Sequence, residues 1–274
     1  MNKEIQTDLN LGGTIETALS GQYELRASDV LKEAWQHTIR HFLSFSPAII
    51  LLAVVQFTIF YIALKLQLGD LGALFEAFSG SEVLTESPTF GANIVQAIVV
   101  GNFSYEVVSA PIYAGVCLMA MSHAAGLKTQ LCHVGKGLQF TVSVIGVTLI
   151  GLVVQIIAGM ILPFLSLYFS LAFSNSILLI CEKNVPPVQA LLLSLRAANK
   201  KLLTLVSVYL VIFVMFIVAA MFYGIGLIFV LPFFFHAKGI IYRNMFGIRL
   251  KIVSTGANKS NDDDNDNNSQ VFDA

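Results

Sequence analysis

The sequence predicts an all-α polytopic membrane protein: a bundle of six transmembrane helices, with cytoplasmic amphipathic helices before spans one and five. Of 274 residues, 56% are hydrophobic and only 12% are charged, whereas a soluble domain carries about 25% charged residues to cover its surface. The deficit is concentrated between positions 47 and 245, and the first 46 and last 20 residues are ordinary polar sequence. The middle of the chain therefore needs lipid as its solvent.

Charge and cysteine content exclude several classes of partner. The net charge of −1 gives no basic stripe that could neutralise nucleic-acid phosphates. The three cysteines, Cys117, Cys132 and Cys181, have no metal-ligand spacing, and we expect them to be buried or to stay reduced. No metal and no cofactor is expected, and the expected partners are the lipid bilayer and other membrane proteins, including further copies of this chain.

The amino-terminal region precedes the first apolar run. Residues 1–27 are mixed polar sequence with several glycines and are predicted to be a disordered segment. The first long apolar run starts only near Pro47, too late for a cleavable signal peptide. We therefore expect the first membrane helix to act as an uncleaved signal.

An amphipathic helix is predicted over residues 28–45. Ser28 is a suitable helix cap, and Asp29 suits the positive end of the helix dipole. A tryptophan, Trp35, falls on the apolar side of this helix. Such a helix either lies in the membrane interface or packs under the bundle, and the periodicity fits both arrangements.

Six apolar runs have the length of membrane spans. Because 20 residues at 1.5 Å rise cross a hydrocarbon core of about 30 Å, the run that starts at Pro47 and ends at Leu66 is sufficient for span one. Pro163 and the Gly224–Gly226 turn predict tight hairpins between spans three and four and between spans five and six. Residues 92–102 are either part of a kinked second span or a short surface helix before it. The predicted spans are about 47–66, 103–122, 138–162, 164–181, 202–223 and 225–242.

Lys and Arg residues predict the orientation. The sequence before span one, the connections after spans two and four and the exit of span six are basic, whereas the opposite face carries only Lys65 at a helix tip. Cytoplasmic connections are enriched in Lys and Arg, so both termini are predicted to be cytoplasmic. The tail, residues 250–274, is Asn-, Asp- and Ser-rich and is predicted to be disordered.

A second surface helix is predicted over residues 186–201. Shifted by 156 positions, it matches the first: Ala34 aligns with Ala190, Thr38 with Ser194 and Arg40 with Arg196. The same shift places Pro47 on Leu203, at the starts of spans one and five. Either a duplicated unit or a shared way of entering a bilayer explains this match.

Four short motifs carry a family resemblance. They are Leu31-Lys32-Glu33-Ala34-Trp35, Gln189-Ala190 with Ser194-Leu195-Arg196, Gly224-Ile225-Gly226, and the Pro232 helix that ends in Tyr242. With these motifs the chain resembles YciC-like bacterial inner-membrane proteins over roughly residues 28–247, and it is similar to the membrane domain fused to some glycerophosphodiester phosphodiesterases. The resemblance implies a six-helix bundle in the bacterial inner membrane with no established catalytic residues. The barrel of those enzymes needs about 250 further residues.

Three ionisable residues inside the predicted spans are candidate functional groups. Glu106 is either a functional carboxylate or an interfacial group, since it lies about 24 Å from the Ser122 end of its helix. Lys238 is expected to snorkel towards lipid phosphates, at a depth about 16 Å from that of Glu106, so that no direct pair is expected. His236 is a candidate for lining a small polar cavity with Asn175, Gln155 or Glu106.

We expect a non-enzymatic inner-membrane protein that serves membrane assembly, envelope maintenance or regulation. No hydrolase, phosphate-loop or metallohydrolase motif occurs in the sequence. The alternative is a transporter or export component for a small or amphiphilic solute, with Glu106 and His236 as working groups. A membrane-embedded enzyme is the third alternative. A cavity that reaches the middle of the bundle would favour transport over the other two.

Overall fold

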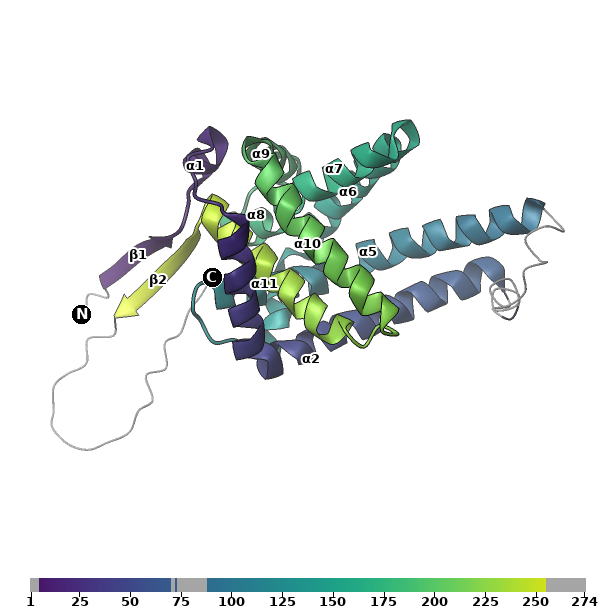
Figure 1. Ribbon diagram of the computed structural model, residues 1–274, viewed down its shortest axis with the longest axis horizontal. Helices are drawn as coiled ribbons and strands as arrows, with labels where there is room; N and C mark the ends of the chain where they lie inside the picture. Colours follow the sequence, from purple (N-terminus) through teal and green to yellow (C-terminus); the bar gives the residue numbers. More distant parts are fainter. Residues whose placement is uncertain (1–4, 70–71, 73–87, 255–274) are drawn as a thin grey trace.

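The computed structural model describes residues 5–69, 72 and 88–254. Within them the chain is helical apart from two short strands (Figure 1). The elements are β1 (Ile5–Leu11), α1 (Ile15–Ser20), α2 (Ala27–Leu68), α5 (Pro88–Ala124), the 3-10 helix η1 (Leu131–Phe140), α6 (Thr141–Ile161), α7 (Pro163–Ala172), α8 (Ser176–Lys183), α9 (Pro187–Lys200), α10 (Leu202–Met221), α11 (Leu227–Phe246) and β2 (Ile248–Ser254).

Five helical segments are long and apolar enough to cross a membrane, by length and composition. The chain is therefore a multi-pass membrane protein. The predicted sixth span, residues 225–242, coincides with α11, which is not one of these five, so the count of six stays a prediction. The five segments are Ala27–Leu68, Asn93–Ala124, Leu131–Ile161, Pro163–Lys183 and Leu202–Met221.

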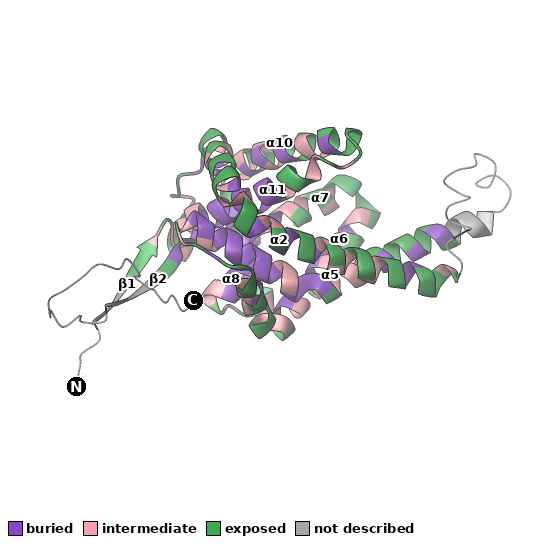
Figure 2. Ribbon diagram, turned by 90° about the horizontal axis from the view of Figure 1, so that it is seen from below, coloured by how far each residue is buried: buried purple, intermediate pink, exposed green. Residues whose placement is uncertain are grey.

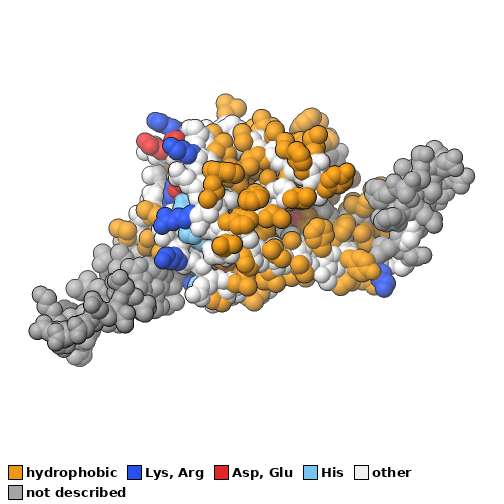
Figure 3. Space-filling model, turned by 60° about the horizontal axis from the view of Figure 1, so that its bottom comes forward, with side chains coloured by type: hydrophobic (Ala, Val, Ile, Leu, Met, Phe, Trp, Pro, Cys, Tyr) orange, Lys and Arg blue, Asp and Glu red, His pale blue; other side chains and the backbone are white. Residues whose placement is uncertain are grey.

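Charged and apolar side chains occupy different regions of the surface. On the face drawn in Figure 3, most Lys, Arg, Asp and Glu side chains gather at the end where β1, β2, α1 and α9 lie, called the charged end below. Apolar side chains cover the middle of the same face. Met160, Phe164 and Leu203 are each more than 80% exposed, as expected for side chains in contact with lipid.

Helix α2 bends close to the predicted start of span one. The sequence predicted an amphipathic helix over residues 28–45 and a separate span that starts at Pro47, but one helix is continuous from Ala27 to Leu68. Figure 1 shows its first part running across the charged end and its second part running beside α5. Proline removes a backbone donor and crowds the carbonyl one turn earlier, which bends a helix without ending it.

The core is formed by α5 and α11, with α2 packed on both (Figure 2). Thirteen of the 20 residues of α11 are buried, more than expected for a helix with one face towards lipid. Gly239 allows α11 to approach α5 closely, because a Cβ atom at this position would lie 2.8 Å from the backbone of Ala120 on α5. The small residues Ala110 and Ala114 face the same core, whereas Gly151 lies beside open space.

The terminal segments pair with each other, which corrects the predicted disorder of residues 1–27 and the predicted start of a disordered tail at residue 250. β1 and β2 are antiparallel, with Leu11 opposite Ile248 and Ile5 opposite Ser254. Tyr23 then fixes the chain after α1, because its hydroxyl donates to the Ala197 carbonyl of α9 at 3.0 Å. Composition alone did not indicate this long-range pairing. Residues 1–4 and 255–274 lie outside the described part.

Two predicted spans have different boundaries in the structure. Helix α5 runs without interruption from Pro88, so residues 92–102 belong to the second span helix. The expected fourth span, residues 164–181, is divided into α7 and α8 by a turn at the buried Asn175. The hairpin predicted at Pro163 is present between α6 and α7.

Candidate functional site

A cavity of about 930 Å³ lies between α5, α6, α7, α10 and α11. Ligand sites in proteins commonly have 300–1,000 Å³, a mainly apolar lining and a few polar groups. Aromatic and aliphatic side chains form most of this lining. Its polar groups include Gln56, Glu106, Tyr113, Thr148, Tyr209 and Lys238.

Lys238 lies inside the bundle, which corrects the prediction that it snorkels to lipid phosphates. The residue is only 4% exposed, and its Nζ donates to the Tyr113 hydroxyl at 2.7 Å. The same ammonium lies 4.7 Å from the centre of the Tyr113 ring, within the range of a cation–π contact. Because α11 is surrounded by other helices, the Lys238 side chain extends into the cavity instead of towards lipid.

Glu106 also lines the cavity and is half-buried. Its level in the bundle follows from its neighbours on α5: Ser109 accepts a hydrogen bond from Gln56 at 3.2 Å, and Gln56 is the tenth of the 20 residues of the run 47–66. Glu106 lies about one turn before Ser109 on α5. Its level in the bundle therefore falls within the run 47–66 of α2 and not at the end of that run. The depth of Glu106 expected from the sequence was measured from Ser122. Helix α5 continues to Ala124, however, and its last turns belong to the charged end.

Glu106 and Lys238 face the same cavity without forming an ion pair. Tyr113, which holds the lysine, lies seven residues after Glu106 on α5, or about 10 Å along the helix axis. In the described residues no ion pair joins the two groups. The cavity therefore has a cationic part and an acidic part separated by about two helical turns.

Two buried polar atoms of the lining lack a hydrogen-bond partner in the described residues. They are the Thr148 hydroxyl of α6 and the Tyr209 hydroxyl of α10. Buried polar atoms in native proteins nearly always have a partner, either protein or water. Both hydroxyls are thus available to water or to the polar group of a ligand.

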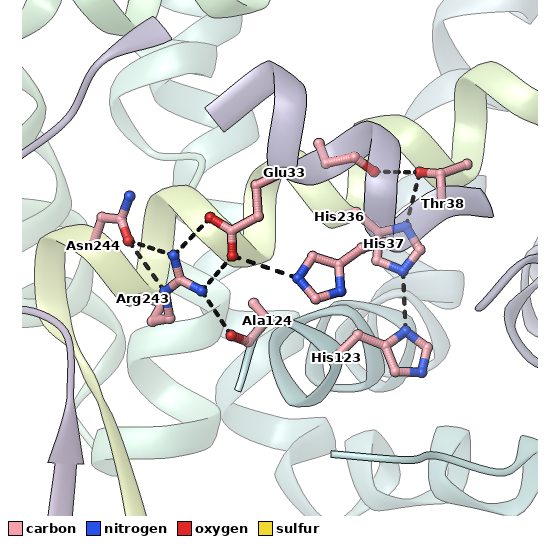
Figure 4. A network of polar contacts seen from close by, with 9 residues as sticks. Glu33, His37, Thr38, His123, Ala124, His236, Arg243 and Asn244 are labelled. Atoms are coloured by element: carbon pink, nitrogen blue, oxygen red, sulfur yellow. Dashed lines mark hydrogen bonds and ion pairs between the residues drawn. The ribbon is translucent and has the colours of Figure 1, made fainter. Parts of the chain in front are cut away.

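His236 lies outside the cavity, contrary to the prediction that it lines one with Asn175, Gln155 or Glu106. It lies two positions before Lys238, and at 3.6 residues per turn these side chains extend from nearly opposite sides of α11. His236 instead belongs to a group of four histidines at the charged end, called the histidine cluster, which also contains His37, His41 and His123. Figure 4 shows His37, His123 and His236.

A directional chain of hydrogen bonds runs through this cluster. The Thr38 hydroxyl donates to the Ala34 carbonyl at 2.7 Å, so it accepts from Nδ1 of His236 at 3.1 Å. Nε2 of His236 then accepts from Nδ1 of His123 at 3.0 Å, and Nε2 of His123 accepts from Thr129 at 2.7 Å. Two neutral imidazoles, each with one donor and one acceptor nitrogen, satisfy every step.

The cluster packs through its rings but does not surround a metal site. His41 stacks on His123 with ring centres 4.1 Å apart, and Phe45 lies 4.7 Å from His236. Within the described part of the chain, no group of three or more His, Cys, Asp or Glu side chains could hold a metal ion. The arrangement is one of hydrogen bonds and stacking between α2, α5 and α11.

Arg243 joins the same three helices next to the cluster (Figure 4). Its guanidinium binds both carboxylate oxygens of Glu33, at 2.6 and 2.9 Å, and donates to the Ala124 carbonyl at 2.8 Å. Glu33 also lies 3.4 Å from Nε2 of His37. Bidentate pairs of this kind fix geometry as well as charge.

Tyr113 of the cavity and His37 and His41 of the histidine cluster were not predicted from the sequence. Two helical patterns could have indicated them: Tyr113 shares one face of α5 with the predicted Glu106, and His37 and His41 are four residues apart on α2. Comparisons of the chain with family models, curated proteins and solved structures each gave no match. The fold and the cavity define a class, a multi-pass membrane protein with a cavity that opens at the surface of the bundle, and the resemblance to YciC-like proteins stays a prediction.

Proposed function

We propose that this chain binds an amphiphilic solute in the cavity and acts as a transporter or export component in the bacterial inner membrane. The observation that carries the proposal is the cavity itself, with an apolar lining and the ionisable side chains of Glu106 and Lys238. An apolar wall accepts an acyl chain or ring system, and few polar groups suffice to orient a head group. The sequence analysis ranked this function second, and the cavity favours it.

Six spans with cytoplasmic ends are part of the proposal. The pairing of β1 with β2 supports an even number of crossings, because both terminal segments then lie on one side of the membrane. Adding α11 to the five apolar segments gives that even number. The gathering of charges at the charged end supports a cytoplasmic location for that end.

A non-enzymatic role in membrane assembly or envelope maintenance is the second candidate. One observation favours it: Trp35, Ile39 and Leu43 form an exposed apolar stripe on the first part of α2. Residues four apart lie on one helix face, and such a face is suited to a lipid interface or to another membrane protein.

The test uses the purified full chain in phosphatidylcholine vesicles and a photoreactive single-chain amphiphile, supplied as the fatty alcohol or the fatty acid. We expect labelling of cavity-lining peptides of α7 and α10 that saturates and is displaced by unlabelled amphiphile. Gly151→Leu should reduce it, because a Cβ at Gly151 meets other atoms only at 3.8 Å or more and further bulk enters the cavity.

Gly146→Leu is the matched control on the same helix. Its Cβ would meet only Pro187, at 3.8 Å, and Gly146 does not line the cavity. Labelling that never saturates, or that Gly151→Leu and Gly146→Leu change equally, would contradict the proposed function.

A further inference from the structure

We propose that the cavity selects amphiphiles with an anionic head group, and that Lys238 is the counter-ion that binds this group. The inference rests on the proposed function, since it specifies which amphiphile the same cavity takes. It starts from the hydrogen bonds that Lys238 lacks.

The Lys238 ammonium is buried with its positive charge uncompensated by the described residues. An ammonium has three donors, and the structure accounts for one, in the bond to the Tyr113 hydroxyl. No carboxylate of the described residues lies within 4.0 Å of it. Because buried charges in proteins are normally paired, a group with negative charge and two or more acceptor oxygens fits this position.

Further polar atoms of the lining fit the same head group. Tyr209 packs against Phe234, with ring centres 6.4 Å apart, and Phe234 lies one helical turn before Lys238 on α11. Among the described residues the Tyr209 hydroxyl has no hydrogen-bond partner, so it is a donor free for a ligand in the same cavity. Thr148 supplies a second free hydroxyl in the same cavity.

Glu106 determines which way the ligand lies. Its carboxylate is about 10 Å from the level of Tyr113 along α5 and repels an anionic head group placed beside it. The head group is therefore directed to Lys238, the part of the cavity nearer the charged end, and the acyl chain lies against the apolar lining of α7 and α10.

The cavity opens at the surface of the bundle, and its volume indicates how much of a ligand it takes up. At ~30 Å³ for a water-sized atom group, the cavity of about 930 Å³ holds on the order of 30 non-hydrogen atoms. That is room for a head group and one acyl chain. The structure therefore points to a single-chain anionic amphiphile, whose head group is a carboxylate or a phosphate ester.

The experiment is a competition assay on the full chain in phosphatidylcholine vesicles, with photoreactive fatty acid as the probe. The competitors are oleate, lysophosphatidylglycerol, oleyl alcohol and inorganic phosphate. The two anionic amphiphiles should displace the probe about 10- to 100-fold more effectively than the alcohol, the range expected for a hydrogen-bonded charge. Inorganic phosphate should not compete, because it lacks the acyl chain, and the ratio of oleate to lysophosphatidylglycerol distinguishes the two head groups.

Three variants test whether Lys238 causes the selectivity for anionic amphiphiles. Lys238→Met should reduce displacement by the anionic competitors to the level of oleyl alcohol. Saturable labelling by the photoreactive alcohol, at whatever affinity, shows that the variant folds. Lys65→Met, at an exposed lysine of α2 outside the cavity, should change nothing. Glu106→Gln should weaken the exclusion of anions from the Glu106 part and broaden the labelling pattern along α5.

The possible failures are distinct. If fatty acid and alcohol label the cavity equally, in the wild type and in Lys238→Met, the anionic selectivity is wrong and the proposed function stands. If neither probe labels the cavity in a saturable way, the proposed function itself is wrong.

Discussion

Nδ1 of His123 and Nε2 of His236 lie 3.0 Å apart in the interior of the charged end, where both residues are at most 1% exposed. This contact joins α5 to α11, and the bond from His236 to Thr38 extends it to α2. One chain of hydrogen bonds with a single direction thus connects the three core helices next to the cavity.

The two histidines should behave as a coupled pair in a double-mutant cycle. His236→Leu leaves the buried donor of His123 without an acceptor, at a cost of about 1–3 kcal/mol in the free energy of unfolding. His123→Leu similarly leaves an acceptor of His236 unused. The double variant should be more stable than the sum of the two effects by about 0.5–3 kcal/mol, measured by unfolding in mild detergent. Strict additivity would show that the hydrogen bond contributes nothing.

Arg243 should not be replaceable by lysine. Arg243→Lys removes the second bond to Glu33, since an ammonium cannot match a carboxylate in a bidentate way, and it weakens the contact with Ala124. We expect a loss of about 1–3 kcal/mol in the same unfolding measurement. Arg249→Lys is the control, because the Arg249 side chain is exposed and the bond from this residue to Glu182 comes from its backbone N–H. An equal effect of both changes would contradict this role.

Composition identified the membrane class because it is a local property of each run. The hairpin at Pro163 and the position of the bend in α2 were also predictable, because a proline marks each in the local sequence. The proline did not indicate whether α2 would bend or would end and a new helix begin. The orientation of Lys238 depended on α11 being surrounded by other helices, and the pairing of β1 with β2 joins segments about 240 residues apart. Neither of these long-range relationships leaves a periodic pattern in the sequence.

High pH should loosen the attachment of the amino-terminal segment to α9. Burial raises the pKa of the Tyr23 hydroxyl to about 12, from an unfolded value of about 10. A raised folded-state pKa contributes stability that is present below pH 10 and is lost as pH rises from about 10 to 12. Limited proteolysis between α1 and α2 should increase over this window in the wild type. Proteolysis of Tyr23→Phe should not depend on pH over this window. If the variant showed the same rise as the wild type, the Tyr23 hydroxyl would not be its cause.

Glu106→Gln separates the two candidate functions. If the chain moves a solute through the cavity, removing this charge removes the repulsion that directs the head group to Lys238. Flux of a single-chain amphiphile out of loaded vesicles should then fall by about 10-fold, which corresponds to a loss of about 1.4 kcal/mol in this preference. Combined with Glu106→Gln, the change Gln56→Glu returns a carboxylate to the cavity at a neighbouring level. It should not restore the flux. If the chain serves assembly or maintenance, both variants should support cellular function as well as the wild type does. Transport would be contradicted if Glu106→Gln changed the flux in no assay.

The contact between α5 and α11 should tolerate no side chain at Gly239. A Cβ there would lie 2.8 Å from the backbone carbon and oxygen of Ala120, so Gly239→Ala must move one core helix, at a cost of about 1–3 kcal/mol. Gly146→Ala is the matched control: its Cβ would meet only Pro187, at 3.8 Å, and replacing glycine by alanine within a helix stabilises by about 0.5–1 kcal/mol. The two substitutions should thus change the unfolding free energy with opposite signs. Because Lys238 is the residue before Gly239, the shift should also weaken binding of the fatty acid more than binding of the alcohol. Equal stability changes at both glycines would show that α5 and α11 pack less closely than the structure indicates.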